Sequence, residues 1–275
     1  MPRLQSGWQA WQAPSHEVDA VRVAAVQHDV VWEDREANHE HLTGLIASAA
    51  AGGADLVVLT EMFPVGFSLA ADRIAEPPDG PSIRFLLEQA EQHGLWTGGS
   101  VPVRDDTDLM PVNRFVLAGP DGTLHHYDKM YPFTYAGERD YYRPGERPLT
   151  VTIEGVKVSL FVCYDLRFSE AFWDLALTTD LYLVPANWPS SRREHWMTLL
   201  RARAIENQAY VLGVNRVGDD PRFSYSGDSL IVDPLGEVLA EAEPGIEAVL
   251  MADVEPERVI SVRTEFPFLQ DRRGK

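Results

Sequence analysis

Cysteine and positive charge are both scarce in this chain of 275 residues. Cys163 is the only cysteine, which excludes an intrachain disulfide and a zinc site built on cysteines. The chain has 24 basic and 42 acidic residues, a net charge of −18. That balance argues against broad nucleic-acid or anionic-membrane surfaces, because these need clusters of positive charge. No apolar run is long enough for a signal peptide or for a membrane span of about 18 residues. We therefore expect a cytoplasmic protein that binds neither nucleic acid nor membrane.

Lysine is rarer still, since only Lys129, Lys157 and Lys275 stand beside 21 arginines. An ammonium is a compact charge whose pKa and position can be tuned, and a guanidinium cannot replace it in that role. Lys129 and Lys157 are therefore candidates for a function, although drift in composition could also leave a few lysines behind.

Apolar runs alternate with helical spacing in both halves of the chain. Expected strands cover residues 21–27, 54–60, 95–102, 156–162, 181–188, 209–217 and 248–254. Expected helices cover 38–51, 81–93 and 191–208, the last opening with capping-box spacing from Ser191 to Glu194. Hairpins are expected over 113–127 and 229–242.

This pattern predicts a single α/β domain in which two sheets face each other and helices cover the outside. We assign residues 1–20 to an N-terminal arm and residues 21–254 to the domain. Residues 255–275 form a C-terminal tail that we expect to be docked on the core or on a partner subunit.

Three polar residues each follow an expected strand directly: Glu61, Lys129 and Cys163. Ligands bind at the carboxyl ends of strands in α/β folds. Together a carboxylate, an ammonium and a thiol supply a base, an oxyanion stabiliser and a nucleophile. Taken singly, each could be structural, as a turn cap, a solvated hairpin end or a small buried apolar residue. Only the fold could bring the three together.

Cys163 ends a buried strand, and a run that can begin a helix follows it from Ser169. The amides that open this helix would lie near the sulfur, so we expect them to favour the thiolate. A reactive cysteine also needs an electropositive and accessible setting, which other parts of the chain would have to supply.

Several ordered segments resemble the signature segments of the nitrilase, or carbon–nitrogen hydrolase, superfamily. They are TEMFPVGFS around Glu61, HYDKMYPF around Lys129 and VCYDLRFSE around Cys163. The stretches VPANWPSSRREHWMTLLRARAIENQAYVLGVNRVG and GDSLIVDPLGEVLA extend the resemblance over residues 21–254. Within the superfamily, CYDLRF, ANWP and ARAIENQAYV resemble the omega-amidase branch, which hydrolyses the side-chain amides of 2-oxo dicarboxylic acids.

The resemblance implies a four-layer α-β-β-α sandwich, a homodimer or higher homo-oligomer, a small amide substrate and no metal or organic cofactor. It assigns catalysis to a Glu-Lys-Cys triad of Glu61, Lys129 and Cys163. A second glutamate then falls on Glu138, with Glu146 as the nearby alternative. In this scheme Glu61 deprotonates Cys163, the thiolate attacks the amide carbon, and a thioester forms and is hydrolysed. Lys129 and the backbone N–H of Tyr164 hold the oxyanion.

An acidic substrate needs a positive pocket within this acidic protein. Arg167, Arg192 and Arg193 are the candidates to bind its carboxylate, although each could instead pair with a neighbouring acid or lie in a helical turn. The substrate-binding residues that we expect are Tyr164, Trp188, Arg167, Phe67 and Tyr135.

Several other readings compete with this one. Within the superfamily, an N-carbamoyl-amine hydrolase, a deaminated-glutathione amidase or a nitrilase would use the same residues, and a non-catalytic binding scaffold is a further alternative. Residues 227–230 match the GDSL motif of serine lipases, but no histidine follows His195. A papain-like pair of Cys163 and His195 fits the composition alone. The spacing of His39-Glu40-His41 matches no metal-binding motif.

Overall fold

The computed structural model describes residues 20–105 and 110–273. The expected N-terminal arm, residues 1–20, lies outside this range except for Ala20. Among the described helices, none has the length and apolar character needed to cross a membrane.

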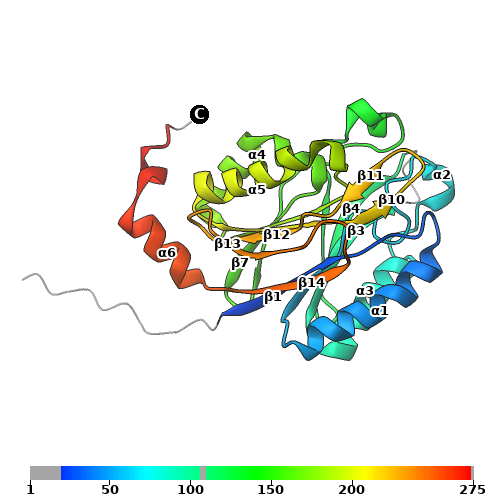
Figure 1. Ribbon diagram of the computed structural model, residues 1–275, viewed down its shortest axis with the longest axis horizontal. Coiled ribbons are helices and arrows are strands. Elements are labelled where there is room, and N and C mark those ends of the chain that lie inside the picture. Colours follow the sequence, from blue (N-terminus) through cyan, green and yellow to red (C-terminus); the bar gives the residue numbers. More distant parts are fainter. Residues whose placement is uncertain (1–19, 106–109, 274–275) are drawn as a thin grey trace, which may run out of the picture.

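Two mixed sheets of six strands form the centre of the molecule (Figure 1). The first has the order β14 (Ala248–Val254), β1 (Val21–Gln27), β2 (Leu56–Val58), β3 (Trp96–Val103), β4 (Val112–Ala118) and β5 (Leu124–Asp128). The second has the order β13 (Val238–Glu241), β12 (Leu230–Val232), β9 (Tyr210–Asn215), β8 (Leu181–Ala186), β7 (Val156–Leu160) and β6 (Thr150–Ile153). Strands β10 (Val217–Asp219) and β11 (Ser224–Ser226) form a separate ribbon.

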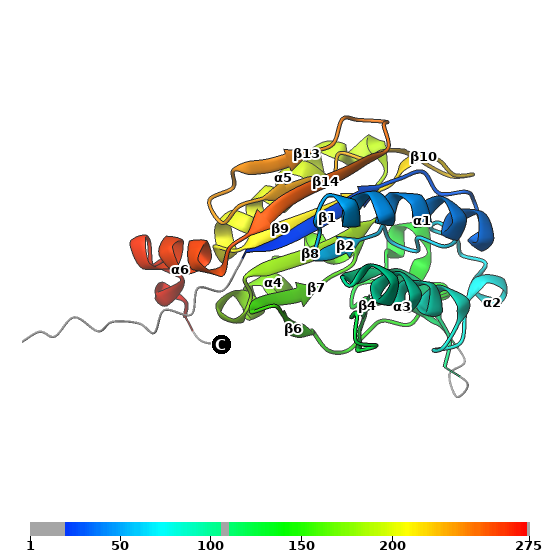
Figure 2. The same ribbon diagram turned by 90° about the horizontal axis from the view of Figure 1, so that it is seen from below.

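Helices cover the outer face of each sheet (Figures 1 and 2). Helices α1 (Arg35–Ala51) and α3 (Pro81–His93) lie on the first sheet, and α4 (Ser169–Leu175) and α5 (Arg193–Asn207) lie on the second. The short helix α2 (Ala71–Ile74) and helix α6 (Pro256–Glu265) lie at the ends of the molecule. This arrangement confirms the predicted four-layer α-β-β-α sandwich.

Strand β1 shows why the sheets are buried on both faces. Val23 and Ala25 point into the core between the two sheets, whereas Ala24 and Val26 point into the core beneath α1 and α3. Successive side chains of a strand point to opposite faces, so a continuous apolar run fits this position. Burying each valine contributes roughly 1.5–3 kcal/mol.

The strand directions bring several carboxyl ends to one edge of each sheet. Strands β1, β2 and β3 are parallel, and β5 runs the same way because β3–β4 and β4–β5 are both antiparallel. In the second sheet β7, β8 and β9 are parallel. The residues that follow β2, β5, β7 and β8 are therefore placed to meet.

The structure differs from the sequence-based expectation at several elements. The predicted capping box at Ser191 is wrong, because a 3₁₀ turn, Ser190–Arg192, precedes α5 and the N-cap is Arg192 without a side-chain cap. The strand expected over 54–60 is shorter in the structure, where β2 covers only Leu56–Val58, and the chain then turns at Met62 with a left-handed φ of 44°. Strand β6, the β10–β11 ribbon and helix α6 were not predicted.

Helix α6 lies within the segment that we expected to be a docked tail. Val259 and Val262 on it are buried. The Arg263 guanidinium donates hydrogen bonds to the carbonyl oxygens of Ala176 (2.9 Å) and Thr179 (2.7 Å). These contacts hold α6 against the chain that follows α4.

Candidate active site

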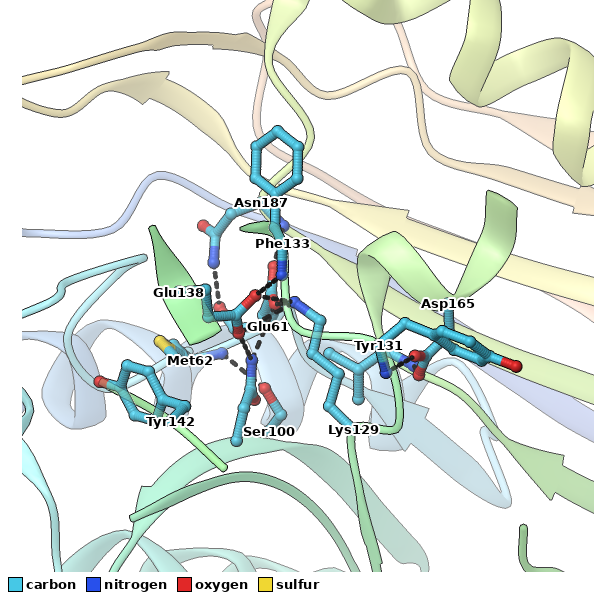
Figure 3. Close-up of polar contacts among 12 residues, drawn as sticks. Glu61, Met62, Ser100, Lys129, Tyr131, Phe133, Glu138, Tyr142, Asp165 and Asn187 are labelled. Atoms are coloured by element: carbon cyan, nitrogen blue, oxygen red, sulfur yellow. Dashed lines mark hydrogen bonds and ion pairs between the residues drawn. The ribbon is translucent and has the colours of Figure 1, made fainter. Parts of the chain in front are cut away.

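A buried ammonium lies between two buried carboxylates. Lys129 follows β5, and its Nζ lies 2.8 Å from Glu61 Oε1 and 2.8 Å from Glu138 Oε2 (Figure 3). The side chain of Lys129 is 1% exposed, and those of both glutamates are 0% exposed. Burial alone would lower the pKa of Lys129, but the carboxylates of Glu138 and Glu61 raise it well above its usual value. The ammonium therefore stays charged.

Glu138, rather than Glu146, is the second glutamate of this cluster. It lies in a 3₁₀ turn, Glu138–Asp140, and also accepts a hydrogen bond of 2.5 Å from the backbone N–H of Phe133. Burial raises the pKa of Glu138, and Lys129 opposes that rise. Glu146 lines a different pocket.

Two asparagines that the sequence did not single out orient the carboxylates. Asn113 Nδ2 donates to Glu61 Oε1 (2.8 Å) and to Glu138 Oε1 (3.2 Å). The backbone N–H of Asn187 donates to Glu61 Oε2 (2.8 Å), and its Nδ2 donates to the Glu61 carbonyl oxygen (2.7 Å). Asn187 directly follows strand β8, which is a signal in the sequence. Asn113 lies inside strand β4 and carries no comparable signal.

Cys163 lies at the turn between β7 and α4, as predicted. It begins a 3₁₀ turn, Cys163–Arg167, with a left-handed φ of 47°. A residue other than glycine pays on the order of 1 kcal/mol for this conformation. Such strain is typical of a side chain held in a functional orientation. The Glu61 carboxylate and the Lys129 ammonium both influence the pKa of the Cys163 thiol, so the sulfur lies close to the lysine cluster.

The net effect of the resting site on the Cys163 thiol is opposite to the effect that we expected from the helix amides. Burial raises the pKa of Cys163 well above its usual value, and the Glu61 carboxylate adds to this effect more than Lys129 opposes it. The thiol is therefore protonated at rest. A nucleophilic role for this sulfur would need a base to remove its proton, and Glu61 is a carboxylate close to it.

An amide hydrogen next to the sulfur is available for an oxyanion. Within residues 20–105 and 110–273, no hydrogen bond uses the backbone N–H of Tyr164 as donor. A donor in this position and the Lys129 ammonium can together stabilise negative charge that develops beside Cys163.

A narrow pocket opens above the thiol. Its walls contain the predicted residues Tyr164, Arg167 and Trp188, together with Phe133, Asn187, Pro189 and Arg192. It encloses about 20 Å³, which is room for about one water molecule.

Two guanidiniums stand at this pocket without a carboxylate partner. The Arg167 guanidinium lies 4.7 Å from the ring of Trp188, and that of Arg192 lies 5.5 Å from the ring of Phe133. In the part of the chain that the structure describes, neither forms an ion pair, and Arg192 Nη2 is buried without a hydrogen-bond partner. Burial lowers the pKa of Arg167, and the nearby Arg192 adds to the effect.

The other predicted residues lie elsewhere. Arg193 forms an ion pair with Asp228 at 2.6 Å and does not line the pocket. The Tyr135 side chain is 81% exposed and is not among the residues that line the pocket. Phe67 lies beside the lysine cluster, with its ring centre 5.6 Å from Lys129 Nζ.

The competing chemistries find little support in the geometry. His195 Nδ1 lies 3.2 Å from Arg167 Nη2 and does not line the thiol pocket. Ser229 is buried, and its hydroxyl donates to Gln27 Oε1 at 2.8 Å. Among the described residues, no group of three or more His, Cys, Asp or Glu side chains could hold a metal ion.

Comparison with known proteins gives a consistent set of relatives. The family model described as carbon-nitrogen hydrolase matches residues 22–264. The chain is 41% identical over 256 residues to the omega-amidase YafV of Yersinia enterocolitica, covering 92% of this chain and 97% of that protein. It is 35% identical to the 2-oxoglutaramate amidase of Bacillus subtilis, covering 80% and 85%. A crystal structure of a CN-hydrolase superfamily protein from Xanthomonas campestris, with an arsenic adduct in its active site, has a TM-score of 0.88. It is 37% identical, with coverage of 94% and 98%.

Proposed function

Because the chain belongs to the carbon–nitrogen hydrolase family, we propose that it hydrolyses the side-chain amide of a small 2-oxo dicarboxylic acid to the acid and ammonia. The family match bears out the resemblance of the signature segments, and the chain is an amidase of the nitrilase superfamily. The substrate class and the roles of individual residues are what we propose here. 2-Oxoglutaramate and 2-oxosuccinamate are the expected substrates.

The first half of the reaction forms a thioester. Glu61 takes the proton from the Cys163 thiol as the sulfur attacks the amide carbon, and a new S–C bond forms. The Lys129 ammonium and the backbone N–H of Tyr164 hold the negative oxygen. The C–N bond then breaks, Glu61 returns the proton to the departing nitrogen, and ammonia leaves.

The second half releases the acid. Glu61 removes a proton from a water molecule, which attacks the thioester carbon. The C–S bond breaks, the sulfur leaves as thiolate and regains its proton from Glu61. Glu138 and Asn113 keep Lys129 and Glu61 in position through both halves, since Glu138 pairs with Lys129, and Asn113 donates to both Glu61 and Glu138.

The observation that carries the choice of substrate is the pair of guanidiniums beside Cys163. The chain has many more acids than bases, yet Arg167 and Arg192 lack a carboxylate partner within the described residues. A substrate carboxylate would supply that partner, and each charge-assisted hydrogen bond is worth about 1.5–3 kcal/mol. The names of the relatives, omega-amidase and 2-oxoglutaramate amidase, support the same class.

Ammonia release from matched amides tests the proposal. We expect kcat/KM for 2-oxoglutaramate or 2-oxosuccinamate to exceed that for butyramide, which lacks a carboxylate, by at least about tenfold. Arg167→Gln and Arg192→Gln should each lower kcat/KM for the 2-oxo acid by about 10- to 100-fold, with a smaller loss for butyramide.

Arg193→Gln is the matched control. It removes the same charge from the next position, but this guanidinium already pairs with Asp228, so the preference for the charged substrate should persist. Equal activity on charged and uncharged amides would contradict the proposed substrate class. N-carbamoyl-β-alanine and a simple nitrile are assayed in the same way. A higher kcat/KM for either compound would assign the protein to that substrate class instead of the 2-oxo acid amides.

A further inference from the structure

A third buried carboxylate, outside the lysine cluster, connects the two segments that carry Lys129 and Cys163. The Asp165 side chain is 0% exposed. Its Oδ1 accepts from the backbone N–H of Tyr131 at 2.9 Å, and its Oδ2 accepts from the Tyr127 hydroxyl at 2.8 Å. Oδ2 also accepts from the backbone N–H of Val162 at 2.8 Å. Figure 3 shows Asp165 and Tyr131 beside the lysine cluster.

The donors are placed symmetrically about the proposed catalytic residues. Tyr127 and Tyr131 each stand two residues from Lys129, and Val162 immediately precedes Cys163. We propose that Asp165 is a positioning residue, which holds the Lys129 segment against the Cys163 turn so that ammonium and thiol keep their relative geometry. This inference rests on the roles proposed above for Lys129 and Cys163.

Burying the Asp165 carboxylate has a cost in free energy. An ionised group that leaves water for a protein interior costs several kcal/mol unless its partners compensate. No Lys, Arg or His of the described chain forms an ion pair with Asp165, so its compensation comes from the charge of Lys129 at longer range and from the three donors. Burial raises the pKa of Asp165 to about 7, whereas the charge of Lys129 and these three hydrogen bonds oppose the rise.

An asparagine could not make the same set of bonds. Its amide nitrogen, which is a donor, would face the backbone N–H of either Tyr131 or Val162. That N–H is also a donor and cannot accept a hydrogen bond. One of the two backbone links would then be lost and a buried N–H left without an acceptor. The Tyr127 hydroxyl can rotate, so the tyrosine link alone would adapt.

Ring contacts between these segments are not a substitute for the hydrogen bonds. The rings of Tyr131 and Phe168 stack at 3.8 Å, but dispersion between rings tolerates sliding, whereas the two backbone hydrogen bonds fix register. The left-handed φ of Cys163, at 47°, also has to be held by the surrounding bonds. The bond from Val162 to Asp165 is adjacent to that strained residue.

The test is Asp165→Asn, assayed on an amide that the unaltered enzyme hydrolyses. A displacement of about 1 Å between reacting groups can cost about 100-fold in rate. We therefore expect kcat to fall by at least about fivefold with KM changed less than about twofold. A smaller fall in kcat overturns the proposal, whatever happens to the melting temperature.

Asp233→Asn is the matched structural control. Asp233 is also buried and accepts from the backbone N–H groups of Leu235 (2.8 Å) and Glu237 (2.9 Å), in the turn between β12 and β13. It should lower the melting temperature and leave kcat unchanged.

If Asp165→Asn does not fold, Tyr127→Phe tests the proposal instead. Loss of its hydroxyl link should lower kcat by about threefold or more at unchanged KM, and unchanged kcat overturns the proposal.

A second measurement separates this inference from the proposed substrate class. Cys163 is the only cysteine, so its alkylation by iodoacetamide, followed by mass, reports on the thiol without any substrate. Slower alkylation in folded Asp165→Asn than in folded Asp233→Asn supports positioning even if 2-oxo acids prove not to be substrates. Equal alkylation rates, like an unchanged kcat, overturn the inference and leave the proposed function standing.

Discussion

At the scale of single residues, Lys129 is the cation that pairs with both buried glutamates of the site. Its ammonium separates the carboxylates of Glu61 and Glu138, and all three groups are buried. Removing the ammonium would leave two negative groups without a cation. Breaking a buried ion pair by removing one partner costs about 3–5 kcal/mol.

We therefore predict that Lys129→Met lowers both turnover and stability. Loss of the proposed oxyanion donor should lower kcat by at least about 100-fold, and urea unfolding should show a loss of about 3 kcal/mol or more. Lys129→Met/Glu138→Gln should regain part of the stability and none of the turnover, because it removes one of the two unpaired carboxylates. Lys157→Met, on the exposed side of β7, is the control. Near-normal turnover in Lys129→Met would refute the role of the ammonium.

The site also shows how far single residues can be read from sequence. Glu61, Lys129 and Cys163 could be singled out because each directly follows a strand expected from the sequence. Their meeting could not be derived from local pattern, since Lys129 and Glu61 are 68 positions apart and come together through the strand order of the first sheet. A positioning role for Asp165 could not be predicted from the sequence. It depends on three hydrogen bonds, two of them to distant residues, that no sequence spacing indicates.

At the scale of elements, the turn between β6 and β7 leads directly into the strand that ends near Cys163. Glu154 and Gly155 form this turn, and both have a positive φ, 46° and 89°. This is the pattern of a two-residue hairpin, in which asparagine followed by glycine is strongly preferred. Glutamate at the first position is strained.

We predict that Glu154→Asn stabilises the protein by about 0.5 kcal/mol, because asparagine adopts the left-handed conformation more readily. The melting temperature should rise by about 1–2 °C, with kcat unchanged. Glu154→Ala removes the same carboxylate without this conformational advantage. Equal melting temperatures for the two variants would show that the turn conformation is not the source of the gain.

Two helices show what made an element easy or hard to locate from the sequence. Helix α3 matches the expected range because Pro81 opens it and Gly94 closes it with a φ of 67°. Helix α6 has few buried apolar residues and depends on contacts such as those of Arg263. Its periodic signal is therefore weak, and the structure is needed to locate it.

At the scale of the whole molecule, the four layers follow from apolar strands that are buried on both faces, and the sequence predicts that arrangement. The pairing of sheets hides some polar groups that local pattern cannot place. His28 is one of them: it follows β1 and is 1% exposed. The homo-oligomer expected from the family resemblance remains a prediction.

His28 should make the folded state sensitive to acid. Burial lowers the pKa of His28 from its ordinary value of 6.5 to about 3, with smaller contributions from His41 and Arg216. Below about pH 6.5 the unfolded chain binds a proton at this position and the folded chain does not. Stability is therefore lost as the pH falls through this interval, by up to about 1.4 kcal/mol per pH unit.

Urea unfolding at pH 7, 6 and 5 checks this prediction. His28→Gln should flatten the decline in stability by about 1 kcal/mol per pH unit. His126→Gln, which changes an exposed histidine, should leave the slope as it is in the unaltered protein. Identical slopes for all three proteins would contradict the burial of a neutral imidazole.

Because the Lys129 side chain is shielded from solvent, its chemical modification can report when the surrounding structure opens. An amine that is protonated and shielded from solvent cannot react with an acylating reagent, whereas Lys157 remains accessible on the same chain. The rate of acylation at Lys129, followed by peptide mass, would thus measure how often the structure around this residue opens. Acylation of Lys157 provides the internal reference.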